Sequence, residues 1–393
     1  MRIVMVGPFG LRPKGTMNVR ALPLAKALTA RGHKVDIILP SWHSPEDSGK
    51  SWEEEGVGIC NVPLPPRIPG VWHLWVARRM LRRVLALNPD VVHCFKPKAY
   101  SGIVALKLWG LQRLGLFAGR IVVDSDDWEG KGGWNEIEEY SAFQRIVFAW
   151  QERWGLLHAN AITVASRALE TLTWGLGVSP STVHYLPNGS ASGELEEGDG
   201  GWVRDKYGLE GRPVILLYTR FFEFSIERLI EIMRRVVTQV PTVRLLVVGR
   251  GLFGEEERFL DLARAAQIGS AVICAGWVEH KDLVDYFAAS DVAIYPYDDT
   301  LINRTKCSVK LIELLAAGLP VVADGVGQNR EYIIDGVSGI LVENRMDAYA
   351  DAVVRLLSDA ELRSRIGVAA QRSVRSEYDW GRLAAVAERA YEE

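Results

Sequence analysis

A lone carboxylate, Glu313, lies within an otherwise apolar helical stretch, and two lysines precede it at helical spacing. If the helix begins early enough, Lys306, Lys310 and Glu313 project along one stripe, because an α-helix turns by about 100° per residue. Ser308 is a candidate N-cap, which would leave free backbone N–H groups at the helix start. A helix N-terminus beside lysines favours a phosphate, and a carboxylate one turn further in can accept hydrogen bonds from the two hydroxyls of a ribose. The alternative is a surface Lys310–Glu313 ion pair that contributes roughly a few tenths of a kcal/mol.

The bulk composition limits the classes of protein that this chain can be. Its 393 residues exceed what one hydrophobic core usually serves, so two domains are expected. The net charge of -3 argues against a general nucleic-acid binder. The four cysteines include no CxxC pair, which indicates reduced thiols rather than a metal site. No apolar run reaches membrane-spanning length, and the first residues, MRIVMVGPFG, are typical of a strand entering a loop rather than of a signal peptide. We therefore expect a cytoplasmic protein that can rest on the inner face of a membrane.

Short β-branched runs alternate with amphipathic helices through most of the chain. In the first half the predicted strands are Ile3–Val6, Val35–Leu39, Val91–His93, Ile121–Asp124, Ala161–Val164 and Val183–Leu186. A break rich in Gly, Ser and acids covers Pro187–Gly201. The pattern then restarts with Val214–Tyr218, Val243–Val248, Ala271–Cys274, Val292–Tyr295, Pro320–Ala323 and Gly339–Val342. This alternation predicts an α/β fold of two Rossmann-like, doubly wound domains that face each other across a cleft.

The predicted domains are residues 1–195 and 196–375, followed by a C-terminal helix, 376–393, that returns to the N-terminal domain. Doubly wound domains bind ligands at the carboxyl ends of their strands, so the cleft is the expected site. A dinucleotide cofactor is not expected, because GPFGLRPKG after the first strand lacks G-x-G-x-x-G and VVGRGLFG matches it only loosely.

Motifs along nearly the whole chain carry a family resemblance. In order they are TARGHKVDIILP, NPDVVHC, LPNGS, LLVVGRG, SDVAIYP, KLIELLAAGLPVVA and DGVSGILV. Together they resemble the retaining GT-B glycosyltransferases of family 4. The resemblance implies transfer of a sugar from a nucleotide-sugar donor with retention at the anomeric carbon, and it implies no metal and no other cofactor. It also implies that the C-terminal half binds the nucleotide and the N-terminal half most of the acceptor.

Residues of the C-terminal half can be carried over one by one. Glu313 matches the second Glu of the family's E-x7-E pattern, which binds the donor ribose, whereas the first Glu falls at Thr305. Arg220 matches the Arg on the donor diphosphate, whereas the Lys that follows it in the family falls at Phe224 or Ser225. The leaving diphosphate gains negative charge as the glycosidic bond breaks, so the missing cation needs a replacement. The candidates for it are Arg304, Lys306 and Lys310.

Other donor contacts follow from the same resemblance. The turn DGVGQNRE should lie below the donor, where glycine permits a close backbone approach, and the alternative is a plain strand–helix turn. The loop GWVEH should contact the nucleobase through Trp277 and Val278, although an aromatic side chain there also suits the domain core. The predicted residues of the turn are Gly327, Gln328 and Asn329, and the remaining nucleotide contacts are Gly249, Ser308 and Val309.

The N-terminal half supplies the predicted acceptor side. Gly15 and Thr16 lie in RPKGTMN, which matches the family loop that faces the donor phosphates. Many relatives carry a histidine after the strand that ends at Asp124, and Asp126 or Asp127 takes its place here. Four acids within six residues also suit Mg²⁺. Because the family needs no metal, we interpret Asp126 and Asp127 as sugar or acceptor ligands, or as a capped turn, and count them with Arg220, Lys306 and Lys310 as candidate catalytic residues.

The segment VWHLWVARRMLRRVLAL predicts a helix with a membrane-facing side. On a helical wheel its arginines span one arc, and Trp72 and Trp75 fall within that arc, while Leu74 and Leu85 fall on the opposite, apolar side. Tryptophan and arginine on one exposed face are typical of an interfacial surface, and the alternative is a solvated cationic helix. The arginines are Arg78, Arg79, Arg82 and Arg83.

These observations favour a retaining hexosyltransferase that uses a UDP- or GDP-sugar and an acceptor hydroxyl, with a membrane lipid or lipid-linked glycan as candidate acceptor. The resemblance implies that the departing phosphate oxygen serves as the base, so no protein nucleophile is required. One alternative is a nucleotide-sugar-binding protein of the same fold that has lost turnover, which the changes at Thr305 and Phe224 favour. Another is a GT-B nucleotide-sugar epimerase.

Overall fold

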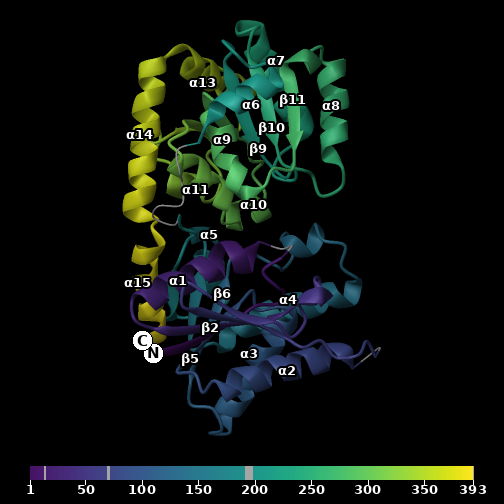
Figure 1. Cartoon of the computed structure of the whole chain (residues 1–393), viewed down its shortest axis with the longest axis vertical. Helices are drawn as coiled ribbons and strands as arrows, with labels where there is room; N and C mark the ends of the chain where they lie inside the picture. Colours follow the sequence, from purple (N-terminus) through teal and green to yellow (C-terminus); the bar gives the residue numbers. More distant parts are fainter. Residues whose placement is uncertain (13–14, 69–70, 191–197, 393) are drawn as a thin grey trace. The chain divides into compact units, whose positions relative to one another are not determined.

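Two parallel sheets, each flanked by helices, organise the protein. The structure, a computed structural model, describes residues 1–12, 15–68, 71–190 and 198–392. Unit 1 comprises Met1–Ala191, Thr305–Cys307 and Trp380–Glu393, and unit 2 comprises Ser192–Arg304 and Ser308–Asp379. Each unit has the strand–helix alternation of a Rossmann-like domain (Figure 1), which confirms the predicted α/β class.

The sheet of unit 1 has eight strands, of which seven run parallel to one another, while β3 is antiparallel to β4. Its central strands are apolar on both faces, as expected for a sheet covered by helices on both sides. In spatial order the strands are β3 (Ser51–Glu54), β4 (Val57–Val62), β2 (Lys34–Pro40), β1 (Arg2–Val6), β5 (Val91–Phe95), β6 (Arg120–Ser125), β7 (Ala161–Val164) and β8 (Val183–Tyr185).

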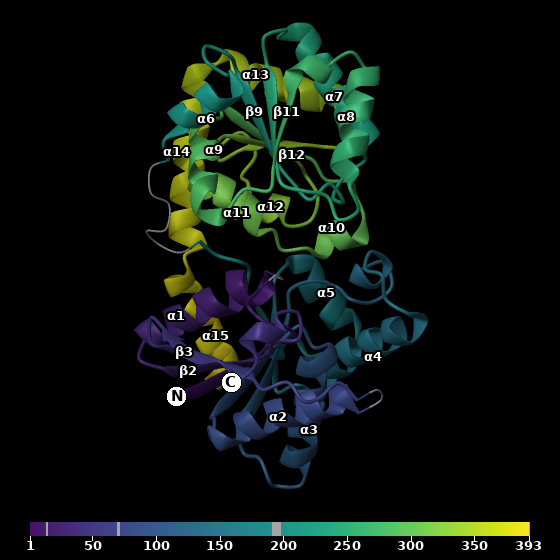
Figure 2. The ribbon, with the colours of Figure 1, turned by 45° about the vertical axis from the view of Figure 1, so that its right-hand side comes forward.

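Helices cover both faces of this sheet. Figure 2 shows α1 (Leu22–Ala30) and α15 (Trp380–Glu392) on one side and α2 (Trp72–Ala86) and α3 (Ala99–Arg113) on the other. α1 packs on α15 because both present apolar side chains to the sheet, among them Leu24, Leu28 and Leu383. The remaining helices of the unit are α4 (Ala142–His158), which packs on α3, and α5 (Arg167–Gly175), which packs on β7 and β8.

Two features of unit 1 differ from the sequence prediction. The antiparallel hairpin of β3 and β4 was not predicted, because SWEEEGVGICNV has few β-branched residues and only alternate positions of β4 are fully apolar. The helical segment between β1 and β2 begins as one π-helical turn, Met17–Ala21, before α1, whereas the sequence predicted only regular amphipathic helices between the strands. Pro23, which lacks an N–H donor, follows that turn and lies in the first turn of α1, where it breaks no internal hydrogen bond.

The sheet of unit 2 is entirely parallel and has six strands. All six were predicted from their β-branched runs. In spatial order they are β11 (Val272–Gly276), β10 (Arg244–Val248), β9 (Val214–Tyr218), β12 (Val292–Tyr295), β13 (Val321–Asp324) and β14 (Ile340–Val342).

Amphipathic helices close the core of unit 2. α7 (Ile226–Gln239) shows the pattern most clearly, because Ile226, Leu229, Met233 and Val236 recur at helical spacing and are buried against the sheet. Each such side chain contributes roughly 1.5–3 kcal/mol relative to an exposed one. The other helices are α6 (Gly200–Tyr207), α8 (Glu255–Ala265), α9 (Leu283–Ala288), α10 (Leu301–Thr305), α11 (Val309–Ala316), α12 (Asn329–Tyr332), α13 (Met346–Ser358) and α14 (Ala360–Glu377).

Candidate functional site

The carboxyl end of β9 brings the predicted donor residues of unit 2 to one place. Tyr218 ends this strand, and Arg220, two residues later, is exposed. Burial and then the Glu313 carboxylate raise the pKa of Tyr218, while the Arg220 charge lowers it. Both charges therefore lie close to the Tyr218 hydroxyl. The structure brings together the two residues that the sequence assigned to ribose and diphosphate.

Glu313 is held on α11 by neighbours that the sequence did not suggest. Its Oε1 lies 3.0 Å from Nε2 of His280, whose ring is well exposed. The ammonium of Lys310, one turn earlier on α11, lies 5.1 Å from the centroid of the Tyr218 ring. Lys310, Glu313 and His280 thus surround the end of β9 with both signs of charge.

The predicted stripe of two lysines and a glutamate is only partly correct. α11 begins at Val309, so Lys306 precedes the helix and does not share its face. Ser308 is the N-cap residue, but its side chain makes no capping hydrogen bond, because its hydroxyl is bonded to the Tyr295 hydroxyl. Tyr295 also contacts the Tyr297 hydroxyl at 3.1 Å, so Ser308 belongs to a buried hydroxyl chain.

The positions that depart from the family pattern are structural in this chain. Phe224 is 6% exposed and belongs to the hydrophobic core of unit 2, so no cation could occupy that position without rebuilding the core. Thr305 is fully buried, and its carbonyl accepts a hydrogen bond of 2.8 Å from Ser166. Within unit 1, Asn188 holds the same segment, because its backbone N–H lies 3.1 Å from Cys307 Sγ and its side chain donates to the Cys307 carbonyl.

Two glycines in unit 2 are required by the backbone. Gly249 has a φ of 118°, and a Cβ there would lie 2.0 Å from the Thr219 carbonyl oxygen. Gly327 has a φ of 51°, and a Cβ there would lie 2.7 Å from the Arg304 backbone. Both turns follow the carboxyl ends of strands, so they place backbone, rather than side chains, beside the predicted donor.

The other predicted donor residues differ in accessibility. Trp277 is 64% exposed, so the alternative that it belongs to the core is wrong, and Val278 beside it is half-buried. Arg304 is exposed and bound through two nitrogens by the Asp299 carboxylate. In contrast, Gln328 and Asn329 are buried, and Asn329 Nδ2 donates to the Asp324 carbonyl at 3.0 Å.

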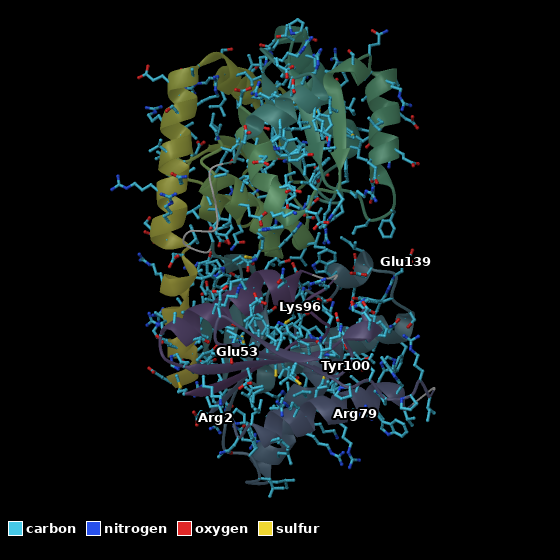
Figure 3. All side chains as sticks on the ribbon, in the orientation of Figure 1. Arg2, Glu53, Arg79, Lys96, Tyr100 and Glu139 are labelled. Carbon is cyan, nitrogen blue, oxygen red and sulfur yellow. The ribbon has the colours of Figure 1, made fainter. Side chains whose placement is uncertain are left out.

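A cluster of buried charges lies at the carboxyl ends of β5 and β6 in unit 1. Lys96, labelled in Figure 3, has its ammonium 3.1 Å from Asp126 Oδ1 and 2.6 Å from Asp127 Oδ2. Lys98 Nζ lies 2.6 Å from Glu129 Oε2. The acids of this cluster were predicted from the sequence and the lysines were not, although KPK directly after a buried strand was the available signal.

Burial controls the protonation of this cluster. It raises the pKa of Asp126 to about 6, with the neighbouring acids Asp127 and Asp124 adding to the effect and Lys96 opposing it. Burial and the Glu129 charge raise the pKa of Glu152, on α4, well above its usual value. Both oxygens of Glu152 accept the Glu129 backbone N–H at 3.1 Å. The cluster can thus hold protonated and ionised carboxyls side by side near neutral pH.

The Mg²⁺ alternative does not fit these residues. Among the residues that the structure describes, no group of three or more His, Cys, Asp and Glu side chains is arranged to hold a metal ion. The Lys96 ammonium lies among the three carboxylates of Asp126, Asp127 and Glu129 and occupies the place that a cation would take.

A second buried network supports the predicted phosphate loop of unit 1. Gly15 accepts the backbone N–H groups of Asn18 and Val19, and Thr16 begins the π-helical turn; residues 13 and 14 of this loop lie outside the described part of the chain. Arg20, in that turn, is fully buried and forms a two-point ion pair with Asp124 at 2.6 and 2.8 Å. It also donates to Asn188 Oδ1 at 3.1 Å. Arg20 therefore links the loop to Asn188, which in turn holds the Cys307 segment through hydrogen bonds.

His93 closes this network on the side of α15. Its Nδ1 lies 2.9 Å from the Tyr391 hydroxyl and its Nε2 lies 3.0 Å from Thr163 Oγ1, which in turn donates to Asp124. Burial lowers the pKa of His93 to about 4, so its ring is neutral at physiological pH. His93 is therefore a core residue whose two ring nitrogens both have hydrogen-bond partners.

The predicted membrane residues lie on α2 with their cationic groups outward. Trp75 and Arg78 are exposed, whereas Trp72 is half-buried and its indole N–H donates to the Pro65 carbonyl at 3.0 Å. Arg79, labelled in Figure 3, donates to the Pro63 carbonyl at 2.7 Å. The helix buries Val76, Ala77, Met80 and Val84.

Arg82 and Arg83 are also exposed. The assignment of Leu74 and Leu85 to the packed side was wrong, because both are exposed beside the arginines. None of the helices in the described ranges has both the length and the apolar character that crossing a bilayer requires.

Comparison with known proteins covers both halves of the chain. Residues 212–359 match the family model "Glycosyl transferases group 1", and residues 15–189 match the model "Glycosyl transferase 4-like domain". The phosphatidyl-myo-inositol mannosyltransferase of Mycolicibacterium smegmatis is 26% identical, over 100% of this chain and 94% of the relative. The GDP-mannose-dependent alpha-mannosyltransferase of Mycobacterium tuberculosis is 24% identical, over 95% and 92%. Among solved structures, Anabaena HepE in complex with UDP-glucose is similar with a TM-score of 0.70 at 17% identity, over 98% of both chains.

Proposed function

This chain belongs to the GT-B glycosyltransferases of family 4, and on that premise we propose that it transfers a hexose from a GDP- or UDP-sugar to an acceptor hydroxyl, with retention at the anomeric carbon. Mannose is the first candidate sugar, because relatives that match nearly the whole chain are named as mannosyltransferases. The observation that carries the proposal is the set of charged residues at the carboxyl end of β9. Lys310 and Glu313 lie one turn apart on α11, the Lys310 ammonium lies 5.1 Å from the Tyr218 ring, and the exposed Arg220 follows this strand.

In this proposal unit 2 binds the donor. Glu313 accepts the ribose hydroxyls, and the exposed Trp277 stacks on the base. Arg220 and Lys310 stabilise the charge that develops on the leaving diphosphate. The departing phosphate oxygen takes the acceptor proton on the same face of the sugar, so neither a protein nucleophile nor a metal is required.

Unit 1 orients the acceptor in this proposal. The acceptor is a polyol or sugar hydroxyl, presented by a membrane lipid, as the name of the mycolicibacterial relative suggests. Asp126 and Asp127 accept hydrogen bonds from hydroxyl groups, and Lys96 fixes both carboxylates. The outward arginines of α2, with Trp75 and Leu74, hold the protein at the anionic surface that carries the acceptor.

A panel of nucleotides tests the donor assignment. We expect GDP, UDP or one of their sugars, but not ADP, to raise the thermal midpoint, because a ligand at a hundred times its dissociation constant stabilises by about 2.7 kcal/mol. Transfer is then measured with the best donor and a phosphatidylinositol acceptor, with and without EDTA, and the anomeric configuration of the product is read by NMR. If no nucleotide shifts the midpoint, the donor site is wrongly assigned.

A binding protein without turnover is the second candidate. It is favoured by the core position of Phe224 and the burial of Thr305, since both remove groups that the family uses in catalysis. Saturation by a nucleotide-sugar without hydrolysis or transfer of the sugar would support this candidate and contradict the first.

A further inference from the structure

Helices α2, α3 and α4 of unit 1 carry an excess of positive charge on their exposed residues. α2 packs against α3, and α3 against α4, so the three helices lie side by side. Every residue of these helices is described, and Glu152 is the one acidic residue among them; it is buried. The whole chain has a net charge of -3, so this excess of positive charge is local. Besides the four arginines of α2, its cations are Lys107, Arg113, Arg145 and Arg153.

α4 also carries an exposed apolar row. Phe143, Ile146 and Trp150 are 75%, 70% and 52% exposed, and Leu157 continues the row. These positions are three, four and seven residues apart, so they lie on one side of the helix. In the C-terminal half of α4 the opposite side is buried, and there Glu152 reaches the charge cluster. α4 is therefore apolar on the side that faces away from its own domain.

Aromatic side chains extend the apolar row towards α3. Trp154 of α4 meets Trp109 of α3 edge to face at 5.4 Å, and the Arg113 guanidinium lies 5.2 Å from the centroid of the Trp109 ring. Leu114 and Leu116, directly after α3, are both strongly exposed. Tryptophan, arginine and exposed aliphatic side chains together are the composition of surfaces that lie at a membrane interface.

We propose that α4 is a second membrane anchor, in which Phe143, Ile146 and Trp150 insert between the headgroups and acyl chains of an anionic bilayer. An anionic lipid surface matches both of these properties, since it attracts the cations and receives the apolar side chains. The proposal deepens the membrane contact of α2 in the proposed function, on which it rests.

The position of the anchor suits an acceptor that is part of the bilayer. Leu74 and Trp75 of α2 and Phe143 and Ile146 of α4 lie near the N-terminal ends of their helices. In strand–helix units, those ends lie at the carboxyl edge of the sheet. A bilayer held there would bring headgroup hydroxyls to the edge at which Asp126 lies.

Vesicle binding by the full chain tests the anchor. The variant F143S/I146S/W150S is compared with wild type on vesicles of phosphatidylglycerol and phosphatidylcholine and on phosphatidylcholine alone. We expect at least a tenfold loss of partitioning onto the anionic vesicles. At about 1 M salt, where the Debye length is about 3 Å, the remaining binding of the wild type should depend on these three side chains. The matched control, I334S/V337S/V368S, removes equally exposed apolar side chains from unit 2 and should bind as wild type does.

The outcomes separate this inference from the proposed function. The α4 anchor would be overturned if R78S/R79S/R82S/R83S lost vesicle binding and F143S/I146S/W150S kept it. The membrane contact of α2 in the proposed function would then still stand. A fall in sedimentation coefficient for F143S/I146S/W150S without vesicles would show that a second copy of the chain covers the row, which also overturns the anchor. Both variants must keep the wild-type thermal midpoint and its shift by nucleotide, so that lost binding reports the surface and not the fold.

Discussion

The charged residues at the carboxyl edges of the two sheets differ in burial and in their partners. In unit 1, Arg20, Lys96 and Lys98 are buried, and each is bound to carboxylates of the same unit. In unit 2, Arg220 lies at the surface, and the exposed His280 ring pairs with Glu313. A nucleotide diphosphate brings its own charge and needs accessible cations, whereas a neutral hydroxyl needs acceptors whose charge is already balanced. The difference assigns the donor to unit 2 and the acceptor to unit 1 in the proposed function.

The strongest challenge to the donor assignment is Arg220→Ala. Loss of a cation that meets developing charge on the leaving group should lower kcat by about 10²–10³-fold, as the loss of a single transition-state donor does in other enzymes. Arg234→Ala, which removes a surface arginine of α7 bound to Glu231, should leave steady-state kinetics unchanged. Equal kcat values for the two variants would remove Arg220 from the catalytic site.

The variant Glu313→Gln probes ribose recognition at the same edge. A hydrogen bond to a charged group contributes roughly 1.5–3 kcal/mol, so the nucleotide should bind about ten- to a hundredfold more weakly. The sharper test is calorimetry with the 2′-deoxy and 3′-deoxy nucleotides. Wild type should discriminate against them and Glu313→Gln should not; discrimination that survives the substitution would place the ribose elsewhere.

Lys306→Ala and Lys310→Ala test whether this segment replaces the cation missing at Phe224. Each should lower kcat by about tenfold, because the charge is shared among several groups, and the arginine variants should restore part of the rate. Arg304→Ala should have a smaller effect, since Asp299 already neutralises that guanidinium. Full turnover in the double variant Lys306→Ala/Lys310→Ala would refute the replacement.

A separate prediction concerns unit 1 and the pH dependence of its stability. Because burial raises the pKa of Asp126 to about 6, the folded state keeps a proton that the unfolded state has lost, so wild type loses stability as pH rises from about 4 to about 6. Asp126→Asn lacks this loss. Its free energy of unfolding relative to wild type should therefore rise across that window by about 3 kcal/mol in total and then stay level.

His93 gives the opposite slope in the same window. Burial lowers its pKa to about 4, so its contribution to stability grows as pH rises towards 6. The term is present in both proteins and cancels in the difference between them. A difference between Asp126→Asn and wild type that does not change with pH would show that the carboxyl group titrates as an ordinary surface acid.

The sequence by itself determined the strand–helix alternation, and through the family resemblance it predicted two donor residues. Runs of apolar β-branched residues indicate buried parallel strands, because such a strand buries the side chains on both of its faces. All six strands of unit 2 were predictable for this reason. Glu313 and Arg220 were recognised because motifs keep their spacing along the chain.

Only the tertiary structure decided which charges meet and which surfaces remain uncovered. Lys96 and Asp126 are 30 residues apart in the sequence, and Arg20 and Asp124 are 104 residues apart. Each pair meets because strands pair in the sheet, and no local sequence pattern encodes that pairing. Phe224, one of the two positions at which the family's diphosphate-binding Lys falls, enters the core. Phe143 lies on an apolar side of α4 that is exposed, whereas periodicity alone would predict that this side is buried. Periodicity shows that a helix has an apolar side, but burial depends on whether another element packs against that side.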